Sequence, residues 1–392
     1  MRDAIVFSGM SWEAFNAPER LSLALAQLGC KVLHCGAPVS VLRGKPQPVR
    51  EVAPGIHSLR LGFISSRLNR VPLAPSLQAR MMYRQIRGLA SEMGLRDPIF
   101  IYFPLGEQFP LCQQMKRDHY LVHVAMDDIG CDPNYELHVE LSDKTLVIPR
   151  SSYHAARAKF GEKVTLIPQS VDFTRLSGAR EAGAPEHPRL AEIPRPRLGY
   201  LGCPQNRLNL PILFSLLRDH PDWQFISVGS QKAVPRANAH SLPWVPAEEL
   251  SALIKGLDVA FLPYNCSDDY QLHCVPLKVF DCFALGIPVV STPLINLWEY
   301  RDLIYFGDTA QELASAVEKA LNEPPDSLRR AARIEVAKKH SIENLAALLS
   351  ECLPWKGDRT EAVGRYDKGI QTVDMQQPMP VAETRMRTLL AS

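Results

Sequence analysis

A lysine and an acid stand three residues apart in the stretch CVPLKVFDCFALGIPVVSTPL, residues 274–294. The stretch begins with the pattern of an amphipathic helix, stops at a glycine and resumes as an apolar strand. The spacing lets Lys278 and Asp281 share one helix face, and Pro276 fits the first helical turn, where a missing N–H costs nothing. Unpaired N–H groups, the positive end of the helix and the lysine together predict a site for an anion such as phosphate.

Asp281 is open to two interpretations. Its carboxylate only accepts hydrogen bonds, which suits a pair of sugar hydroxyls. The same spacing also fits a surface ion pair with Lys278 that contributes little to stability. Spacing alone does not decide between them.

Two adjacent acids follow an apolar run in the first half, YLVHVAMDDIGCDP. Strands of a parallel sheet end at the edge where ligands bind, and a carboxylate there could take a proton from an attacking hydroxyl. We expect Asp127 to be this base, with Asp128 second, because neighbouring carboxylates raise the pKa of one of them. The alternative for each is a helix N-cap or an Asx turn.

The loop at residues 8–20 should reach the same edge of the first sheet. Trp12 could stack on a sugar or a lipid, and Glu13 and Arg20 could bind polar groups of the same acceptor.

Short apolar runs alternate with helix-length amphipathic segments in both halves of the chain, which predicts parallel sheets flanked by helices. The expected strands are 4–7, 31–35, 98–103, 120–125, 145–148, 164–167, 197–201, 223–228 and 258–262. The expected helices include 19–28, 210–218, 248–255 and 310–321. Between them, residues 173–196 are rich in Pro, Gly and charge and predict a linker. Residues 356–392 predict a mostly disordered tail.

Length and composition narrow the class of protein. A chain of 392 residues predicts two domains of roughly 150–200 residues each. A net charge of +2 argues against a nucleic-acid binder. Nine scattered cysteines without a CxxC pair suit a reducing compartment. The chain starts without a signal-peptide pattern, and no apolar run reaches the roughly 20 residues that a spanning helix needs. These features predict a cytoplasmic protein.

Arginines mix with Leu, Ile, Met and Tyr at helical spacing between residues 60 and 87. Such a segment could lie on an anionic bilayer from the cytoplasmic side. A helix that faces the core and carries a solvated basic side is the commoner interpretation.

The stretch that holds Lys278 resembles the donor-binding signature of GT-B glycosyltransferases, in which P-x-K-x-x-E precedes A-x-G-x-P-V-V. The resemblance implies that Pro276, Leu277 and Lys278 face the diphosphate of a nucleotide sugar and that Asp281 holds its ribose. Asp281 replaces the usual Glu, and His273 stands where the family's earlier glutamate would fall, within the same donor loop. The usual retaining mechanism is therefore not implied.

Other segments extend the resemblance over about residues 1–352. Residues 198–230 are similar to the family's nucleotide-binding strand, glycine loop and helix, which implies that Gly202 and Gly229 let a ligand approach the backbone and that Arg207 adds positive charge. Gly202 could instead be only a turn residue, and Arg207 only solvated. The backbone near Val245 would hold the base. The YLVHVAMDDIGCDP segment resembles the strand end that carries the base in inverting bacterial exopolysaccharide enzymes, which again implies Asp127.

The resemblance implies an α/β protein of GT-B fold, with two Rossmann-like parallel-sheet domains facing each other across a cleft. Residues 1–172 would bind the acceptor and 197–340 the nucleotide sugar, and the helix at 341–355 would return to the first domain. The expected activity is transfer of a sugar from a nucleotide diphosphate, with UDP preferred, to a saccharide or lipid-linked glycan without metal or other cofactor. The alternatives are a non-catalytic binder of nucleotide sugars and a sugar-nucleotide epimerase.

Overall fold

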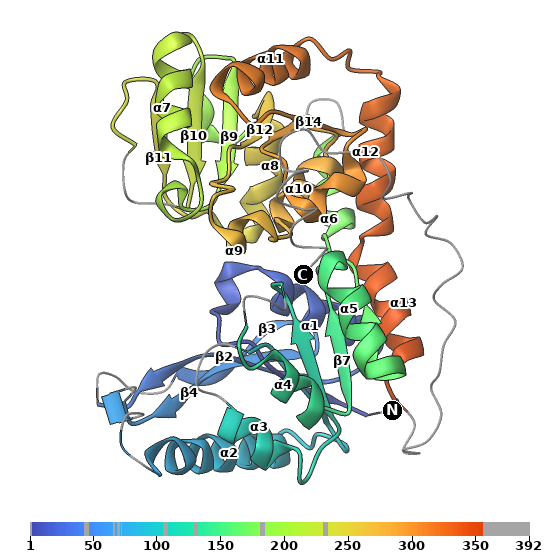
Figure 1. Cartoon of the computed structure of the whole chain (residues 1–392). Helices are drawn as coiled ribbons and strands as arrows, with labels where there is room; N and C mark the ends of the chain where they lie inside the picture. Colours follow the sequence, from blue (N-terminus) through green and yellow to red (C-terminus); the bar gives the residue numbers. More distant parts are fainter. Residues whose placement is uncertain are drawn as a thin grey trace.

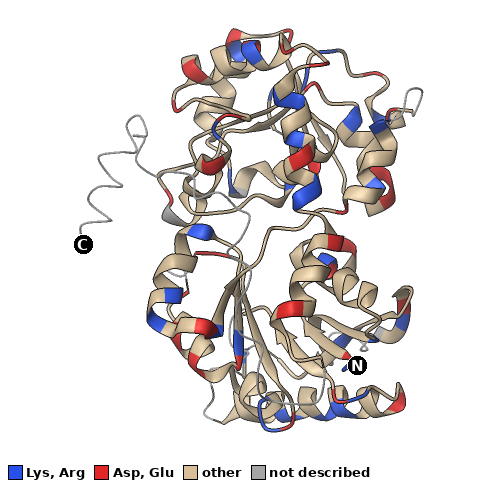
Figure 2. Cartoon of the chain, turned by 90° about the vertical axis from the view of Figure 1, so that its right-hand side faces the viewer, with Lys and Arg blue, Asp and Glu red and all other residues tan. Residues whose placement is uncertain are grey.

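The computed structural model describes residues 2–42, 47–65, 67–68, 71, 73–104, 109–128, 132–180, 185–229 and 234–355. Figure 1 shows two lobes, one above the other, joined by segments on one side. Lys and Arg are interspersed with Asp and Glu over both lobes (Figure 2). The predicted tail at 356–392 lies outside the described residues.

The first sheet has eight strands in the order β3-β4-β2-β1-β5-β6-β7-β8. All neighbours pair in parallel except β3 and β4. Its strands are β1 Ala4–Phe7, β2 Val32–Ser40, β3 Gln47–Ala53, β4 Ile56–Phe63, β5 Ile99–Tyr102, β6 Leu121–Ala125, β7 Lys144–Val147 and β8 Val164–Leu166. Its helices are α1 Ala17–Gln27, α2 Ala74–Glu92, α3 Phe109–Met115, α4 Tyr135–Leu141 and α5 Arg150–Phe160.

The second sheet is parallel throughout, in the order β11-β10-β9-β12-β13-β14. Its strands are β9 Arg197–Leu201, β10 Gln224–Val228, β11 Ala239–Leu242, β12 Val259–Leu262, β13 Val289–Ser291 and β14 Ile304–Phe306. Its helices are α6 Phe173–Ser177, α7 Leu210–Asp219, α8 Leu250–Lys255, α9 Asp269–Leu272, α10 Leu277–Ala284, α11 Ala310–Leu321 and α12 Leu328–Lys339. Two parallel-sheet Rossmann-like domains are thus present, as the alternating pattern predicted.

Helix α1 has a strong local start signal. A capping box joins Asn16 and Glu19, and proline occupies the first turn, so the unpaired N–H groups there find acceptors. One side of the helix buries Leu21, Ala24 and Leu25 in the first domain's core. This packing holds the preceding residues 8–16 at the carboxyl end of β1.

The last helix, α13 (Ile342–Cys352), crosses back to the first domain (Figure 1). It packs on α1, and Ile342, Leu345 and Leu349 belong to the first domain's buried cluster. Backbone pairing of Val171 with Ser341 brings the two crossing segments together.

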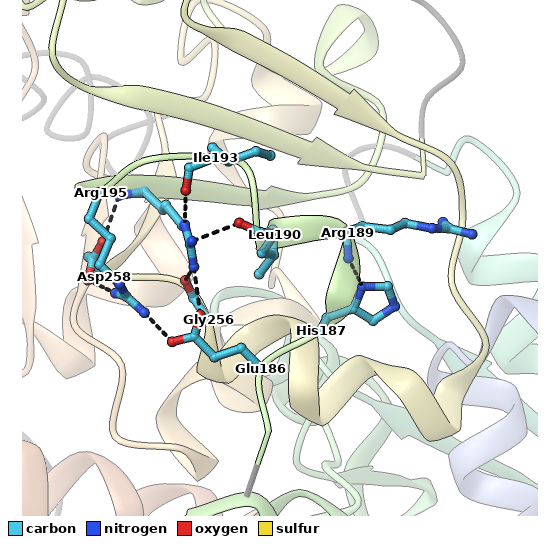
Figure 3. Close-up of polar contacts among 9 residues, drawn as sticks. Glu186, His187, Arg189, Leu190, Ile193, Arg195, Gly256 and Asp258 are labelled. Atoms are coloured by element: carbon cyan, nitrogen blue, oxygen red, sulfur yellow. Dashed lines mark hydrogen bonds and ion pairs between the residues drawn. The ribbon is translucent and has the colours of Figure 1, made fainter. Parts of the chain in front are cut away.

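The described part of the segment predicted as a linker packs on the second domain. Residues 173–177 form α6, and two 3-10 turns follow at Gly178–Arg180 and Pro188–Leu190. Arg195 binds both Glu186 and Asp258 (Figure 3). Arg197 donates to the carbonyls of Ile193, Leu190 and Gly256. Pro, Gly and charge here mark an irregular segment that is attached to the following domain, where Arg195 pairs with Asp258 and Glu186 pairs with Arg197.

The β3–β4 hairpin was not predicted. Pro48, Pro54 and Gly55 interrupt residues 47–63, and these residues are typical of loops. Gly55 adopts φ 77° in the tight turn, and β3 lies at the sheet edge, where proline is tolerated. No helix in the described part of the chain is long and apolar enough to cross a membrane.

His340 lies where the chain crosses between the domains and makes stability depend on pH. Its Nδ1 lies 2.9 Å from the Gln169 carbonyl oxygen, its Nε2 lies 3.1 Å from the Tyr300 hydroxyl, and its ring stacks on Phe280. Burial lowers the pKa of this imidazole to about 4. Neutral His340 therefore contributes stability that is complete above about pH 6.5 and is lost as pH falls towards about 4.

In the native chain the free energy of unfolding should fall by about 3 kcal/mol between these pH limits because of His340, and the His340→Gln variant should not show this fall. The measurement is the free energy of urea unfolding at several pH values between these limits. An unchanged slope in the variant would assign the dependence to other groups.

Candidate active site

Two glycines end neighbouring strands of the second sheet. Gly202 follows β9 with φ 139°, and Gly229 follows β10 with φ 103°. The Gly202 N–H donates to the Val228 carbonyl at 2.7 Å, which holds the two strand ends together. Both φ values lie in the region that favours glycine. This edge therefore presents backbone where other residues would carry a side chain.

Lys278 stands directly over Gly202. A Cβ on this glycine would be 3.2 Å from Lys278 Nζ. The ammonium lies 4.1 Å from the centre of the Tyr200 ring and 3.3 Å from the Tyr264 hydroxyl oxygen. Because Lys278 is in the first turn of α10, its charge adds to the positive end of that helix. The arrangement suits an anion at the edge of the second sheet.

The other residues expected around the donor lie at different depths. Pro276 is the N-cap of α10 and is buried. Leu277 packs against the core of the first domain, so its side chain is directed across the domain boundary. Val245 is 3 % exposed within an apolar cluster, which leaves its backbone as the group that could contact a ligand.

A chain of polar contacts links Arg207 to the first domain. Its guanidinium donates to the hydroxyl oxygen of Tyr270 at 3.3 Å and lies over the same ring. The Tyr270 hydroxyl in turn donates to Asp127 Oδ1 at 3.1 Å. Tyr270 follows two adjacent acids in NCSDDYQLHC. A tyrosine beside acids gives a weak signal in the sequence, so its contact with Asp127 became visible only in three dimensions.

Asp127 has a raised pKa. Loss of water around the carboxyl is the largest cause, the hydrogen bond from Tyr270 and the charge of Arg207 lower the pKa in part, and Asp128 raises it slightly. Burial disfavours the ionised form of a carboxyl, which brings its pKa closer to the range that a general base needs. The neighbouring-acid effect expected from sequence is present but small.

Asp128 makes a different set of contacts. Its Oδ2 accepts from the Ser151 and Ser152 hydroxyls at 3.0 and 2.7 Å and lies 3.3 Å from Nδ1 of His273. His273 comes from the second domain, where its carbonyl accepts from Asn296. The two adjacent acids thus meet two different residues of the opposite domain.

Arg20 and Asp281 differ most from their expected roles. Arg20 was expected to hold the acceptor and Asp281 the ribose. The two side chains instead form a bidentate ion pair across the domains, at 2.7 and 2.9 Å, and Arg20 also donates to the Ser170 carbonyl. They are 1 % and 3 % exposed. Neither group is presented to a ligand in this arrangement, because each satisfies the other. The ion pair proposed from spacing forms with Arg20 rather than with Lys278.

The loop at residues 8–16, expected to hold the acceptor and called here the acceptor loop, supplies one further contact between the domains. Trp12 packs edge-on to His34, and Glu13 pairs with Arg50. The Glu13 carbonyl accepts from the indole N–H of Trp244 at 3.1 Å. Trp244 was missed from sequence, yet half of it is exposed, and its ring lies 2.7 Å from where a Gly229 Cβ would stand.

In the described residues, no group of three or more His, Cys, Asp or Glu side chains could hold a metal ion.

Comparisons with known proteins show which family and which folds the chain resembles. Residues 211–351 match the family described as glycosyl transferase-like. The chain is 26% identical over 229 residues to TuaH of Bacillus subtilis (strain 168), a provisionally assigned teichuronic acid biosynthesis glycosyltransferase. This match covers 54% of the chain and spans about half, 53%, of that relative's length.

Solved structures share the fold over most of the chain. A UDP-forming α,α-trehalose-phosphate synthase from Burkholderia xenovorans, in complex with glucose-6-phosphate, superposes with a TM-score of 0.62 at 13% identity, covering 89% of this chain and 99% of that one. A sucrose-phosphate synthase from Thermosynechococcus elongatus gives 0.61 at 14% identity, covering 89% and 98%. An E. coli trehalose-6-phosphate structure bound with UDP-2-fluoro glucose gives 0.60 at 12%, covering 89% and 99%. At these identities the likeness shows a shared fold.

Proposed function

We propose that the chain is a GT-B glycosyltransferase that transfers a sugar from a UDP-sugar to a saccharide or lipid-linked glycan, because residues 211–351 match a glycosyl transferase-like family and the chain shares the fold of such enzymes. The position of Lys278 carries this proposal. Its ammonium stands over a bare glycine at the carboxyl edge of the second sheet, beside the start of α10. A diphosphate placed there would meet both the lysine and the backbone N–H groups. The UDP-2-fluoro glucose in the E. coli structure of the same fold supports UDP as the first nucleotide to test.

The reaction needs a group that takes the proton of the acceptor hydroxyl as it attacks the anomeric carbon. Asp127 is assigned this role because it faces the donor domain through Tyr270 and has a raised pKa. Asp128 is second, because three polar groups already surround its Oδ2. The acceptor would lie against the first domain near Trp12 and Glu13.

Lys278 and the start of α10 would stabilise the negative charge that grows on the leaving diphosphate. Transfer should therefore continue in EDTA without added metal. Loss of activity in EDTA that Mg²⁺ or Mn²⁺ restores would overturn this part of the proposal.

Removal of the Lys278 charge is expected to weaken UDP binding by about 10- to 100-fold, because a hydrogen bond to a charged group contributes about 1.5–3 kcal/mol. Isothermal titration of Lys278→Ala with UDP measures this loss. Lys319→Ala, which removes an exposed lysine of α11, is the control and should bind as the native chain does. Unchanged UDP affinity in Lys278→Ala would place the donor elsewhere.

His273 stands where the resemblance places the first glutamate of the family's signature. For this reason two other functions are tested beside sugar transfer. A non-catalytic binder would bind UDP-sugar and turn none over. An epimerase would change the sugar without any acceptor. Incubation with labelled UDP-sugars, with and without saccharide acceptors, separates these from transfer, and the anomer of the product assigns inversion or retention.

A further inference from the structure

Exposed apolar side chains gather at one tip of the first domain. The described residues have eight large hydrophobic side chains that are exposed, and five of them fall within residues 41–77. These five form what we call the apolar tip: Val41, Leu42, Val71, Leu73 and Leu77. Monomeric proteins seldom gather such residues at one place unless the place contacts something.

The tip is one connected structure. Val41 follows β2 and donates its N–H to the Phe63 carbonyl at the end of β4. The Ser65 N–H then donates to Gln78 of α2 at 2.9 Å. Figure 1 shows the ends of β2 and β4 and the start of α2 on the same outer side of the lower lobe. Three segments thus present their apolar residues together.

Leu73 is the least expected member. It is the N-cap of α2 with φ 69° and is 83 % exposed. Leucine is a poor N-cap, since it cannot accept from the free N–H groups, and a left-handed conformation is unfavourable for it. Its exposure, its conformation and its position all act against stability. A contact made by the leucine side chain would explain its presence.

Positive charge continues from the apolar tip along the exposed face of α2. Arg80 and Arg84 follow Leu77 at positions +3 and +7, on the side opposite the buried Ala79, Met82 and Ile86. Among the described residues, no carboxylate lies within 4.0 Å of either arginine. These arginines are therefore available to a partner with negative charge.

The segment as a whole is strongly basic. Residues 41–92 include nine Lys or Arg and two acids, a net charge of +7, whereas the whole chain has +2 and the remainder therefore −5. A near-neutral total hides this asymmetry. A basic helix face continuous with exposed leucines suits a surface that is apolar below and anionic above, as the boundary of a bilayer is.

We propose that the apolar tip and the basic face of α2 dock the protein on an anionic membrane surface. The leucines would enter the acyl boundary, and Arg80 and Arg84 would bind lipid phosphates. β2 runs from beside the acceptor loop, where Ala37 donates to the Met10 carbonyl, out to the tip. Docking would therefore bring the acceptor side of the proposed active site to the membrane. Membrane docking does not depend on the transfer reaction. Only the link between docking and a lipid-linked acceptor rests on the proposed function.

Vesicle sedimentation tests the proposal with the full chain. The native protein should bind vesicles of equal parts phosphatidylglycerol and phosphatidylcholine, bind pure phosphatidylcholine far more weakly, and be released by high salt. Arg80→Gln with Arg84→Gln should lower the partition coefficient by about 25-fold. Leu73→Ser with Leu77→Ser should lower it on both kinds of vesicle.

Matched controls are Lys338→Gln with Lys339→Gln, on the exposed side of α12, and Leu328→Ser, at the start of that helix. Both should bind as the native chain does. UDP titration of every variant should give native affinity, so a failure of docking and a failure of the donor site are separately visible. Equal binding by the tip and control variants would overturn the proposal. A tip that proved to mediate self-association in gel filtration, without binding vesicles, would also overturn it.

Discussion

Replacement of Asp127 by Asn is expected to lower kcat for sugar transfer by about 10²- to 10⁴-fold, which is the contribution of a positioned general base. Asparagine has nearly the same shape and can still accept from Tyr270, so the contact between the domains should remain. UDP affinity should therefore change little. Steady-state transfer together with UDP titration measures both effects.

The pH profile gives a sharper test of the same residue. The pKa of Asp127 is raised. As the pH is lowered, activity should therefore begin to fall at a pH above the pKa of an ordinary aspartate. The Tyr270→Phe variant removes the hydrogen bond that lowers this pKa. The acid limb of its profile should therefore move to higher pH. Full activity in Asp127→Asn, or a larger loss in Asp128→Asn, would transfer the role of base to another group.

Loss of Arg20 is expected to cost more stability than loss of any exposed pair. The ion pair with Asp281 is almost fully buried and bidentate, and removing one member leaves a charge without a partner. Arg20→Met should therefore reduce the free energy of unfolding by about 3–5 kcal/mol. Adding Asp281→Leu should recover much of this loss, because apolar residues can replace a buried pair at little net cost.

Urea unfolding of the single and double variants measures the coupling. Lys159→Met breaks the exposed pair with Glu136 and should change stability by an amount too small to resolve. Equal losses in Lys159→Met and Arg20→Met would contradict the assignment. UDP titration of Asp281→Asn asks a separate question: a large loss of affinity would return Asp281 to the ribose role that the family resemblance implied.

Periodicity predicted most of the parallel strands because each is a short buried run bounded by turn residues. It failed for β3 and β4, because the prolines and the glycine that are typical of loops lie here within a hairpin at the edge of the sheet. Residues 173–196 show no periodicity, and their described part contains α6, two 3-10 turns and a pair between Arg195 and Asp258, 63 positions away.

The candidate site was predictable where its residues lie in short local motifs. Lys278 and Gly202 carry their chemistry in local motifs, and the structure brings them together. Tyr270, Trp244 and the partner of Asp281 act through contacts between the two domains, and a single sequence gives no signal for such contacts. Asp281 shows this best: a family motif suggested a ligand contact, whereas the nearest cation comes from a residue 261 positions away.

The return of α13 has a consequence for how the chain is made. The first domain's core includes Ile342, Leu345 and Trp355, so this domain lacks part of its interior until the second has been synthesised. A nascent chain released from the ribosome only up to residue 172 would expose the apolar side of α1 to solvent and to chaperones. The first domain is therefore expected to mature after the second, in the reverse of the order of translation. A fragment meant to fold alone would need residues 341–355 supplied as a separate peptide or fused to its end.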